Sequence, residues 1–451
     1  MSLRVSRNAI PSSVRCVSDR LLQSGYQSYL VGGCLRDLLL GRQPNDWDLA
    51  TDARPDTVAS MFERTYRVGA AFGTVVVLAP EPVEVTTFRK DFAYEDGRRP
   101  AYVEFASTIE EDLARRDFTM NAIAYDMRSQ RVVDPFGGVD DIAREIIRTV
   151  GVPEERFRED ALRMLRAVRF VAALGFAVEY RTRIAMEEEV DRVRFLSAER
   201  IRDELLGLLV GANVGEALWL LYEVGLLERV LPELRGADKL PQMKPGAPTL
   251  LAHLIRTTEE TPPRAAVRLA ALFHDVGKMT TRRELPDGRV VFHGHERAGE
   301  EIVRRACQRL RMEKRFTGHV ASLVHMHMVE GDVTKKAVRR WVGAYGEEWV
   351  RDLVALRRAD HVASGGDDAE NSFPRRLEAL LDEVLAEESA FTVRDLAING
   401  HDVMERAGIP PGPLVGDILN ALLERVLEDP SLNERATLLQ LVDMELRNRS
   451  G

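Results

Sequence analysis

The stretch "YLVGGCLRDLLLGRQPNDWDLATD" (residues 29–52) decides the fold class of the first part of this chain. Tyr29–Val31 has the apolar character of a short strand, and two glycines after it are typical of a tight turn. Cys34–Leu40 follows with the pattern of a helix, which Gly41 can terminate. "WDLAT" then has the pattern of a second strand. This order of elements predicts a mixed α/β unit at the N-terminal end.

Two carboxylates, Asp46 and Asp48, flank a tryptophan in this stretch. Residues two apart on a strand point to the same side, so we expect these carboxylates to lie together. They repel each other unless a divalent cation bridges them. A solvated strand edge or a helix cap also explains an isolated Asp-x-Asp. The glycine pair upstream favours the cation, because backbone N–H groups at a helix start face an anion.

A third carboxylate, Glu84, lies in "TVVVLAPEPVEVTTFR", which has the pattern of a hairpin with Ala79–Pro82 as its loop. Glu84 alternates with Val83 and Val85, so it points away from them. If its strand neighbours the first carboxylate pair, it completes an acidic cluster; otherwise it is an exposed strand residue. A phosphate-binding turn beside an acidic cluster predicts nucleotidyl transfer with two Mg²⁺ ions about 4 Å apart.

The bulk composition is that of a globular protein. The chain has 451 residues, 45% hydrophobic and 30% charged, enough for about three domains. Three widely spaced cysteines exclude a disulfide framework and indicate a reducing compartment. We find neither a signal-peptide core nor an apolar run long enough to span a bilayer, so we expect a cytoplasmic protein with no membrane partner. The net charge of −9 does not exclude RNA, because local patches matter more.

Several further motifs resemble, in order, those of class II tRNA nucleotidyltransferases, the CCA-adding enzymes that share their head with bacterial poly(A) polymerases. They are "RRDFTMNAIAYD" (115–126), "DPFGGVDDI" (134–142), "RFREDALRMLRAVRFVAALGF" (156–176) and "LAINGHDVMERAGIPPGPLVGDIL" (396–419). The resemblance implies that Asp46 and Asp48 are Mg²⁺ ligands. It implies CTP and ATP as substrates and the tRNA 3′ end as partner. The residues it implies for nucleotide binding are Gly32, Gly33, Arg36 and Asp37 on the triphosphate side, and Arg115, Asp117 and Asn121 near ribose and phosphate.

The segment "EDALR" (159–163) contains a pair suited to base selection. Asp160 and Arg163 lie off the helical stripe of apolar residues and can face a cavity together. A carboxylate accepts and a guanidinium donates, which matches the Watson–Crick edges of C and A and mismatches U and G. The resemblance implies this role; a surface ion pair is the alternative.

Arginines crowd the stretch around this segment, and we expect some to contact nucleotide or RNA phosphate and others to pair with Glu154, Glu155 and Glu159. They are Arg144, Arg148, Arg156, Arg158, Arg163, Arg166 and Arg169. Upstream, residues 89–105 are charged and turn-rich and predict a mobile loop. That loop resembles the flexible loop of family members that add the terminal A, and argues against an enzyme that stops after CC.

Eight of the nine histidines lie between His253 and His361, which indicates a separate metal-binding module. The segment before it, residues 240–250, has the composition of a linker. The pattern resembles that of HD phosphohydrolases, with ligands at His253, His274, Asp275 and Asp360. It implies a divalent transition metal or Mg²⁺ and phosphatase or 2′,3′-cyclic phosphodiesterase activity. We expect His295 and His325 to hold a second ion, and His293, His319, His327 and His361 to be structural.

The sequence therefore predicts an α+β protein with four parts. They are a nucleotidyltransferase head (1–145), a helical neck and body (146–240), an HD domain (241–365) and a helical RNA-binding tail (366–451). The leading hypothesis is addition of C, C and A to tRNA. The alternatives are addition of A alone to tRNA, a poly(A) polymerase, an HD phosphohydrolase whose head binds nucleotide, and a non-catalytic RNA-binding protein. The oligomeric state does not follow from the sequence.

Overall fold

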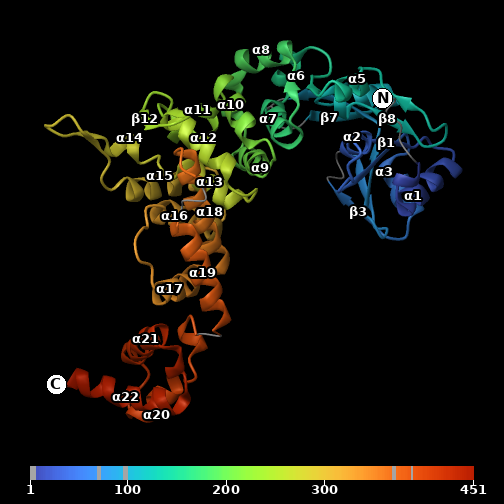
Figure 1. Cartoon of the computed structure of the whole chain (residues 1–451). Helices are drawn as coiled ribbons and strands as arrows, with labels where there is room; N and C mark the ends of the chain where they lie inside the picture. Colours follow the sequence, from blue (N-terminus) through green and yellow to red (C-terminus); the bar gives the residue numbers. More distant parts are fainter. Residues whose placement is uncertain (1–6, 69–72, 95–99, 368–371, 388–389, 451) are drawn as a thin grey trace. The chain divides into compact units, whose positions relative to one another are not determined.

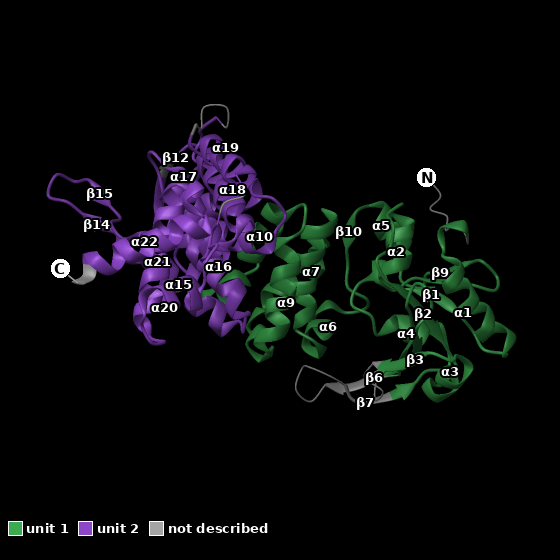
Figure 2. Cartoon of the chain, turned by 90° about the horizontal axis from the view of Figure 1, so that it is seen from below, with its two compact units in different colours: residues 1–232 green, residues 233–451 purple. Residues whose placement is uncertain are grey.

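A computed structural model describes residues 7–68, 73–94, 100–367, 372–387 and 390–450. Its contacts divide the chain into two compact units, residues 1–232 and 233–451 (Figure 1, Figure 2). A mixed sheet with helices forms the start of the first unit, and the rest of the described chain is mostly helical. This arrangement confirms the predicted fold class. The finer division into four parts remains a prediction. In the described ranges, no helix combines the length and apolar character needed to cross a membrane.

Within its described residues, the first unit contains a seven-stranded sheet with the order β3-β4-β5-β2-β1-β8-β9. Strands β2 and β5 are parallel, and all other neighbours in this sheet are antiparallel. The strands are β1 (Tyr29–Val31), β2 (Trp47–Thr51), β3 (Thr65–Val68), β4 (Thr74–Val77), β5 (Val83–Thr87), β8 (Ala124–Asp126) and β9 (Val132–Val133). The central position of β2, between β1 and β5, brings the two predicted acidic segments side by side.

Short helices accompany this sheet. They are α1 (Ser12–Gln23), α2 (Gly33–Leu39), α3 (Pro55–Met61), α4 (Ile109–Ala114) and α5 (Gly138–Ala143). Helix α2 contacts β1 and β2, so the glycine turn stays beside the central strands. Ile109 and Leu113 of α4 pack with Val31, Ala50 and Ala124 of β1, β2 and β8 in one buried cluster. This buried cluster holds in place the central strand β2, which carries Asp48.

The segment predicted as a mobile loop, residues 89–105, contains two strands, β6 (Arg89–Tyr94) and β7 (Pro100–Phe105). They form an antiparallel hairpin separate from the main sheet. The prediction was therefore wrong for both arms, in which aromatic residues such as Phe92 and Tyr102 favour strand formation. The centre of the predicted loop, residues 95–99, lies outside the described residues.

Helices make up the remainder of the first unit. They are α6 (Pro153–Glu159), α7 (Leu162–Leu174), α8 (Tyr180–Glu188), α9 (Ala198–Leu209), α10 (Val214–Glu223) and α11 (Leu227–Val230). Helix α7 packs against both α9 and α10. A short parallel pair, β10 (Ile146–Ile147) and β11 (Ala177–Val178), joins the chain before α6 to the chain after α7.

The second unit begins with a hairpin, β12 (Pro241–Lys244) and β13 (Ala247–Thr249), where the sequence predicted a linker. Its helices are α12 (Leu250–Glu260), α13 (Ala265–Phe273), α14 (Lys278–Thr281), α15 (His295–Arg309), α16 (Lys314–Met326), α17 (Lys335–Tyr345), α18 (Glu347–Ala363), α19 (Ser372–Ala386), α20 (Gly400–Ala407), α21 (Pro413–Glu428) and α22 (Arg435–Ser450). A second short hairpin pairs β14 (Arg283–Glu284) with β15 (Val290–Val291). Helices α12, α13, α16 and α18 pack around one another and, together with the residues directly after α13 and α16, carry six of the eight clustered histidines.

Candidate functional site

The predicted acidic cluster forms at the junction of β2 and β5. The parallel register pairs Asp48 directly with Glu84, so both side chains point to the same face of the sheet. Asp46 is exposed and precedes β2 by one residue. Burial and the negative charges of Glu84 and Asp46 raise the pKa of Asp48 to about 6, although Arg116 opposes the shift. A carboxylate held in this way favours either a proton or a cation beside it.

The glycine turn touches this cluster. Gly32 adopts φ +76°, and a Cβ there would lie 3.2 Å from Oδ2 of Asp48 and 3.1 Å from Nη1 of Arg116. A side chain would therefore suffer both backbone strain and crowding against the carboxylate. Gly33 begins α2 directly after the turn. The spatial contact between the glycine turn and the acidic pair, which the sequence could only suggest, is thus present for Asp48.

Arg116 is a site residue that the sequence reasoning missed. Asp112 is buried and holds two successive arginines: Oδ1 accepts from Arg115 at 2.8 Å, and Oδ2 accepts from Arg116 at 3.2 Å. Arg116 also donates to the backbone oxygen of Asn121 and lies against Gly32. Arg115 was the residue predicted to contact phosphate. Two of its nitrogens donate to Asp112, whereas only one nitrogen of Arg116 does so. The doubled arginine in the motif was the available signal, but it does not tell which member faces the acidic cluster.

A chain of hydrogen bonds joins α2 to α7 through the other predicted nucleotide-binding residues. Nη1 of Arg36 donates to Oδ1 of Asn121 at 3.0 Å, and Nδ2 of Asn121 donates to Oδ1 of Asp117 at 3.0 Å. Arg36 also pairs with the adjacent Asp37 at 2.7 Å. Nε of Arg166 reaches Oδ2 of Asp117 at 2.8 Å. Burial alone would raise the pKa of Asp117, but Arg166 and Asn121 lower it to about 2. The structure thus joins five of the predicted residues, Arg36, Asp37, Asp117, Asn121 and Arg166, in one network.

Asp160 and Arg163 were predicted to face a cavity together, with a surface ion pair between them as the alternative; among the described side chains they form no such ion pair and have other partners. Helix α6 ends at Glu159 and α7 starts at Leu162, so Asp160 lies in a break and its Oδ1 accepts from the backbone N–H of Leu162. Oδ2 of Asp160 pairs with Arg200 at 2.6 Å. Arg163 is buried and pairs with Glu159 at 2.9 Å. The sequence reasoning assumed one uninterrupted helix, and the break gives the two residues different partners.

Most of the other arginines of this stretch also form ion pairs within the protein. Arg148 pairs with Asp141 and Glu179, and Arg158 pairs with Glu189. On α7, Arg169 and Arg166 share Glu204 of α9. Of the three glutamates predicted as partners, Glu159 pairs with Arg156 and Arg163. The ion pairs of this region therefore bind helices together as well as offering positive charge.

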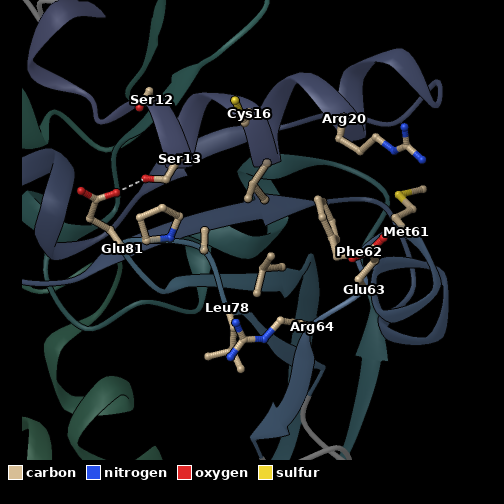
Figure 3. A pocket seen from close by; sticks show the side chains of 14 residues that line it. Ser12, Ser13, Cys16, Arg20, Met61, Phe62, Glu63, Arg64, Leu78 and Glu81 are labelled. Atoms are coloured by element: carbon tan, nitrogen blue, oxygen red, sulfur yellow. Dashed lines mark hydrogen bonds between the residues drawn. The ribbon is translucent and has the colours of Figure 1, made fainter.

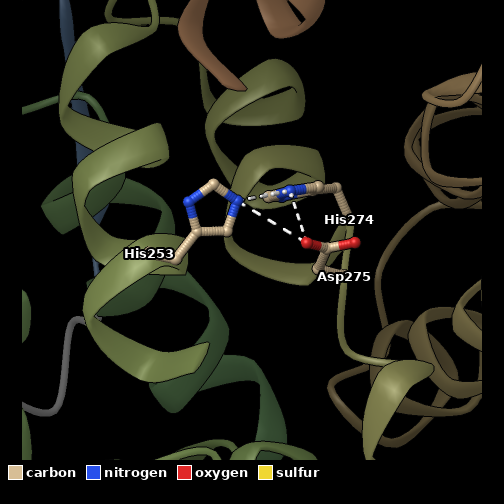
Figure 4. A group of neighbouring side chains, drawn as sticks. All are labelled: His253, His274 and Asp275. Atoms are coloured by element: carbon tan, nitrogen blue, oxygen red, sulfur yellow. Dashed lines mark hydrogen bonds and ion pairs between the residues drawn. The ribbon is translucent and has the colours of Figure 1, made fainter. Parts of the chain in front are cut away.

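A second cluster lies in the second unit, where His253, His274 and Asp275 converge (Figure 4). Thr249 caps α12 by accepting from Ala252, which places His253 in the first turn of that helix. The Nε2 atoms of His253 and His274 lie 3.1 Å apart, and Oδ2 of Asp275 lies 3.6 Å and 3.4 Å from them. Oδ1 of Asp360, on α18, lies 3.1 Å from Nε2 of His253. The two histidines of the predicted HD set thus lie 3.1–3.6 Å from an oxygen of each of the two aspartates.

The other oxygen of Asp275 faces a second group. Its Oδ1 lies 3.2 Å from Nε2 of His295 and 3.5 Å from Nε2 of His327, and these two nitrogens are 3.3 Å apart. The predicted partner of His295, His325, is instead 38% exposed and lies 3.0 Å from Glu300. We therefore correct this part of the prediction: His327, which the sequence analysis took as structural, completes the second group. Asp275 contributes one oxygen to each group.

Backbone carbonyls fix the orientation of three of these imidazoles. Nδ1 of His274, His295 and His327 lies 2.6–2.8 Å from the oxygens of Ala271, Phe292 and Val324, respectively. An Nδ1–H that donates to a carbonyl leaves the lone pair of Nε2 toward the cluster. Although burial opposes it, the neighbouring imidazoles hold the pKa of Asp275 well below its ordinary range. Nitrogen and carboxylate donors in this arrangement fit a divalent transition metal.

Two lysines extend into this cluster. Nζ of Lys244, at the end of β12, lies 2.8 Å from Nε2 of His253 and 3.5 Å from Oδ1 of Asp360. Nζ of Lys278 lies 2.5 Å from Oδ2 of Asp275. Burial lowers the pKa of Lys244, although the carboxylates oppose the shift. The sequence reasoning missed Lys244 because it treated its segment as a linker.

A separate cavity of about 670 Å³ lies beside α1 and the β4–β5 turn (Figure 3). Ser13 donates to Glu81 at its edge, and Cys16, Arg20 and Arg64 also line it. Its lining includes none of the residues predicted for catalysis or nucleotide binding. We assign it no part in the chemistry of the two clusters.

Comparison with known families matches three stretches of the chain. The "Poly A polymerase head domain" matches residues 28–148, the "Probable RNA and SrmB- binding site of polymerase A" matches residues 175–237, and the "HD domain" matches residues 249–365. The first match contains the acidic cluster and the third contains the histidine cluster. The order of the three matches agrees with the order of the motifs in the sequence.

Curated relatives match along nearly the whole chain. The CCA-adding enzyme of Geobacillus stearothermophilus is 37% identical over 420 residues, 93% of each chain. That of Geobacillus kaustophilus (strain HTA426) is 37% identical over 418 residues, 92% of each chain. Among solved structures, the Bacillus stearothermophilus CCA-adding enzyme in complex with CTP has a TM-score of 0.73 and 32% identity, over 97% of this chain and 98% of that one. The Thermotoga maritima CCA-adding enzyme complexed with tRNA, at 18% identity and a TM-score of 0.56 over 99% of this chain and 100% of that one, shares the fold.

Proposed function

The chain belongs to the family of CCA-adding enzymes, and from this premise we propose that it adds C, C and A, from CTP and ATP, to the 3′ end of tRNA. The single observation in this chain that supports the proposal most strongly is the acidic cluster at the glycine turn. Asp48 pairs in register with Glu84 and lies against Gly32. Burial and the neighbouring carboxylates raise the pKa of Asp48, so the ionised form of Asp48 is unfavourable for folding. A cation bound beside the phosphate-binding turn best explains why these carboxylates lie together there.

In this proposal, Asp46 and Asp48, assisted by Glu84, hold Mg²⁺ in the head. Two Mg²⁺ ions, when bound, would activate the 3′-hydroxyl and neutralise the triphosphate and the leaving pyrophosphate. Arg116 holds positive charge beside the same carboxylates. The network from Arg36 to Arg166 fixes the side chains that face the incoming nucleotide. Gly32 permits close approach of the triphosphate to the backbone.

We propose Asp160 and Arg163 as the residues that select C and A, but their present partners add a requirement. Asp160 must exchange Arg200, and Arg163 must exchange Glu159, for the edge of the base. Each wrong base would leave a buried polar group unpaired, at about 1–3 kcal/mol. Asp160→Ala should therefore relax the choice among the four nucleoside triphosphates more than it lowers the rate with CTP.

The experiment that tests the main proposal offers the protein three tRNAs, which lack CCA, end after the first C, or end after CC. Each is incubated with each nucleoside triphosphate in turn, and the products are sequenced. Addition of C to the first two and of A to the third supports CCA addition. Addition of A alone, to the third tRNA only, would assign the A-adding activity, and long A tails would assign a poly(A) polymerase.

We further propose that the histidine cluster is a metal-dependent phosphohydrolase site. The observation that supports this second activity is the position of Asp275, whose two oxygens face two separate groups of histidines. A divalent metal held there would supply Lewis acidity for phosphoester hydrolysis. His274→Ala should abolish hydrolysis and leave nucleotide incorporation intact, and Asp48→Ala should do the reverse. If each variant lost both activities while remaining folded, the assignment of two separate sites would be wrong.

A further inference from the structure

The ammonium group of a lysine lies among the ligand atoms of the first group, which consists of His253, His274, Asp360 and Oδ2 of Asp275. Nζ of Lys244 is 2.8 Å from Nε2 of His253, 3.5 Å from Oδ1 of Asp360 and 3.8 Å from Oδ2 of Asp275. The same Nε2 of His253 points toward His274 and Asp275 (Figure 4). Lys244 is therefore directed at the atoms that would ligate an ion in this group.

Nε2 of His253 cannot serve Lys244 and a metal ion at the same time. An ammonium group only donates hydrogen bonds, so the Nε2 that lies 2.8 Å from Lys244 must accept. An imidazole has one lone pair for this purpose, whereas each carboxylate oxygen has two. Lys278 does not create the same conflict, because Nζ of Lys278 lies 2.5 Å from Oδ2 of Asp275, which keeps a second lone pair. Entry of an ion into the first group thus requires Lys244 to leave.

The charges of the first group give a second reason for this competition. Lys244 and Lys278 supply two positive charges, which match the two carboxylates of Asp275 and Asp360. A divalent ion held by the same carboxylates would face both ammonium groups at short range. Repulsion between like charges is strong in a buried site, so withdrawal of Lys244 relieves it.

The second group is arranged differently. Oδ1 of Asp275 faces Nε2 of His295 at 3.2 Å and Nε2 of His327 at 3.5 Å. Lys244 and Lys278 both meet Asp275 at its other oxygen, Oδ2. An ion can therefore enter the second group while Lys244 keeps its contacts with the first.

The hairpin of β12 and β13 anchors the backbone beside Lys244 from two sides. Nη1 of Arg256, on α12, donates to the backbone oxygen of Pro245 at 3.1 Å. Pro245 also packs against Gly365, where a Cβ would lie 2.9 Å from Cγ of the proline. The ammonium group, by contrast, lies at the end of a flexible four-carbon stem. The side chain of Lys244 can therefore withdraw from the first group while the hairpin stays in place.

We propose that Lys244 is a tethered cation that competes with the metal ion for the first group. The chain then takes up one ion at the second group, and it takes up the other at the first group only when Lys244 withdraws. The inference rests on the metal site proposed above, but not on its phosphohydrolase activity. A site that is open for only a fraction of the time binds more weakly by that fraction. Removal of the ammonium group should therefore tighten binding of the weaker ion about tenfold or more.

The test is a calorimetric titration of the full chain with Co²⁺, which binds imidazole well, in excess Mg²⁺ to occupy the head. The wild type should bind one ion tightly and another at least about tenfold more weakly. Lys244→Met should tighten the weaker ion and leave the tighter one unchanged. In His327→Ala, which retains the first group, Lys244→Met should tighten the ion that remains. Lys239→Met alters an exposed lysine ahead of the hairpin and is the matched control, which should change neither ion.

Chemical labelling follows Lys244 in the unsubstituted protein. An amine-specific reagent, read by mass spectrometry, should modify Lys244 several times faster with Co²⁺ than without it, and Lys239 at equal rates. Weaker Co²⁺ binding by Lys244→Met would make Lys244 a ligand and overturn the inference, as would unchanged binding or unchanged labelling. If the predicted shifts occur but the chain hydrolyses no phosphoester, only the proposed phosphohydrolase activity is wrong. If no variant binds Co²⁺, the inference and the metal site are both wrong.

Discussion

Replacement of Asp48 by asparagine should stabilise the metal-free protein while it abolishes nucleotide incorporation. The folded protein raises the pKa of this carboxyl from 3.8 to about 6, through burial and the charges of Glu84 and Asp46. A raised carboxyl pKa means that the folded state binds the proton more tightly, so stability falls as pH rises from about 4 to about 6. At pH 7.5 the full penalty is present. At 1.36 kcal/mol for each pKa unit, it amounts to about 3 kcal/mol at most.

The assay is calorimetric unfolding in EDTA at pH 7.5 and at pH 5. Asp48→Asn should raise the melting temperature of the first unit by several degrees at pH 7.5, since 1 kcal/mol corresponds to about 2–4 °C for a domain of this size. The gain should shrink at pH 5, where Asp48 is largely protonated in the folded protein. Addition of Mg²⁺ should stabilise the wild type but not the variant. Asp46→Asn is the matched control, because Asp46 is exposed and its removal should shift the melting temperature less.

The reasoning would be refuted if Asp48→Asn were no more stable than the wild type in EDTA at pH 7.5. It would also fail if Mg²⁺ stabilised both proteins equally. The first result would mean that the folded protein accommodates the ionised carboxylate without a cost in stability, and the second would mean that Asp48 does not bind the cation.

Three further predictions concern other parts of the two clusters. Gly32→Ala should reduce nucleotide incorporation at least about tenfold, measured by primer extension, because a methyl group at φ +76° would press on the acidic cluster; near-normal extension would show that the close contact is dispensable. Arg166→Met should lower the free energy of unfolding by about 3–5 kcal/mol at pH 7, because it leaves the buried Asp117 carboxylate without its cation, and the loss should diminish as the pH falls below about 4, where protonation of Asp117 in the variant removes the uncompensated charge; a loss that is independent of pH would point to packing instead. His327→Ala should reduce the bound metal, measured by elemental analysis, from two ions per chain to one, whereas His325→Ala should leave it unchanged; equal metal content in both variants would contradict the second group.

Much of the fold of the head could be predicted from the sequence, because the local sequence pattern there agrees with the structure. The short strand at Tyr29–Val31, the turn at Gly32 and the strand that begins at Trp47 lie where their composition predicted them. Alternation along β5 also predicted the face of Glu84 correctly, because its strand is the parallel neighbour of β2. The pairing of β2 with β5, however, depends on the tertiary fold. From the sequence alone, this pairing could only be assumed as a condition.

The errors arose where a residue's environment depends on a helix boundary or on a distant partner. His325 and His327 differ by two positions at the end of α16, and only the point at which that helix ends decides which one reaches Asp275. In the same way, the break between α6 and α7 goes with different ion-pair partners for Asp160 and Arg163. Neither boundary is marked by glycine or proline, so periodicity alone could not place it.

Two segments were mispredicted because their environment depends on a distant partner. They are the Arg115–Arg116 pair and the predicted linker at residues 240–250. Arg115 and Arg116 are chemically identical and both pair with the buried Asp112, and only the tertiary contacts of Arg116 with Asn121 and Gly32 show which one faces the acidic cluster. The segment that carries Lys244 has the proline and glycine content of a linker, yet it forms a hairpin that presents the lysine to His253. Composition describes how a segment bends, but it does not specify what the segment packs against.

The central claim is that Asp48 is a direct ligand of the divalent cation used for nucleotide addition, and replacement of its carboxylate by a thiolate tests it most directly. Asp48→Cys should incorporate no C into a tRNA that lacks CCA when Mg²⁺ is the only divalent ion, because Mg²⁺ prefers oxygen ligands. Replacement of Mg²⁺ by Mn²⁺ or Cd²⁺, which accept sulfur, should restore part of the incorporation in the variant but not exceed that of the wild type. Wild-type incorporation by the variant with Mg²⁺, or the same residual rate with all three ions, would contradict the claim.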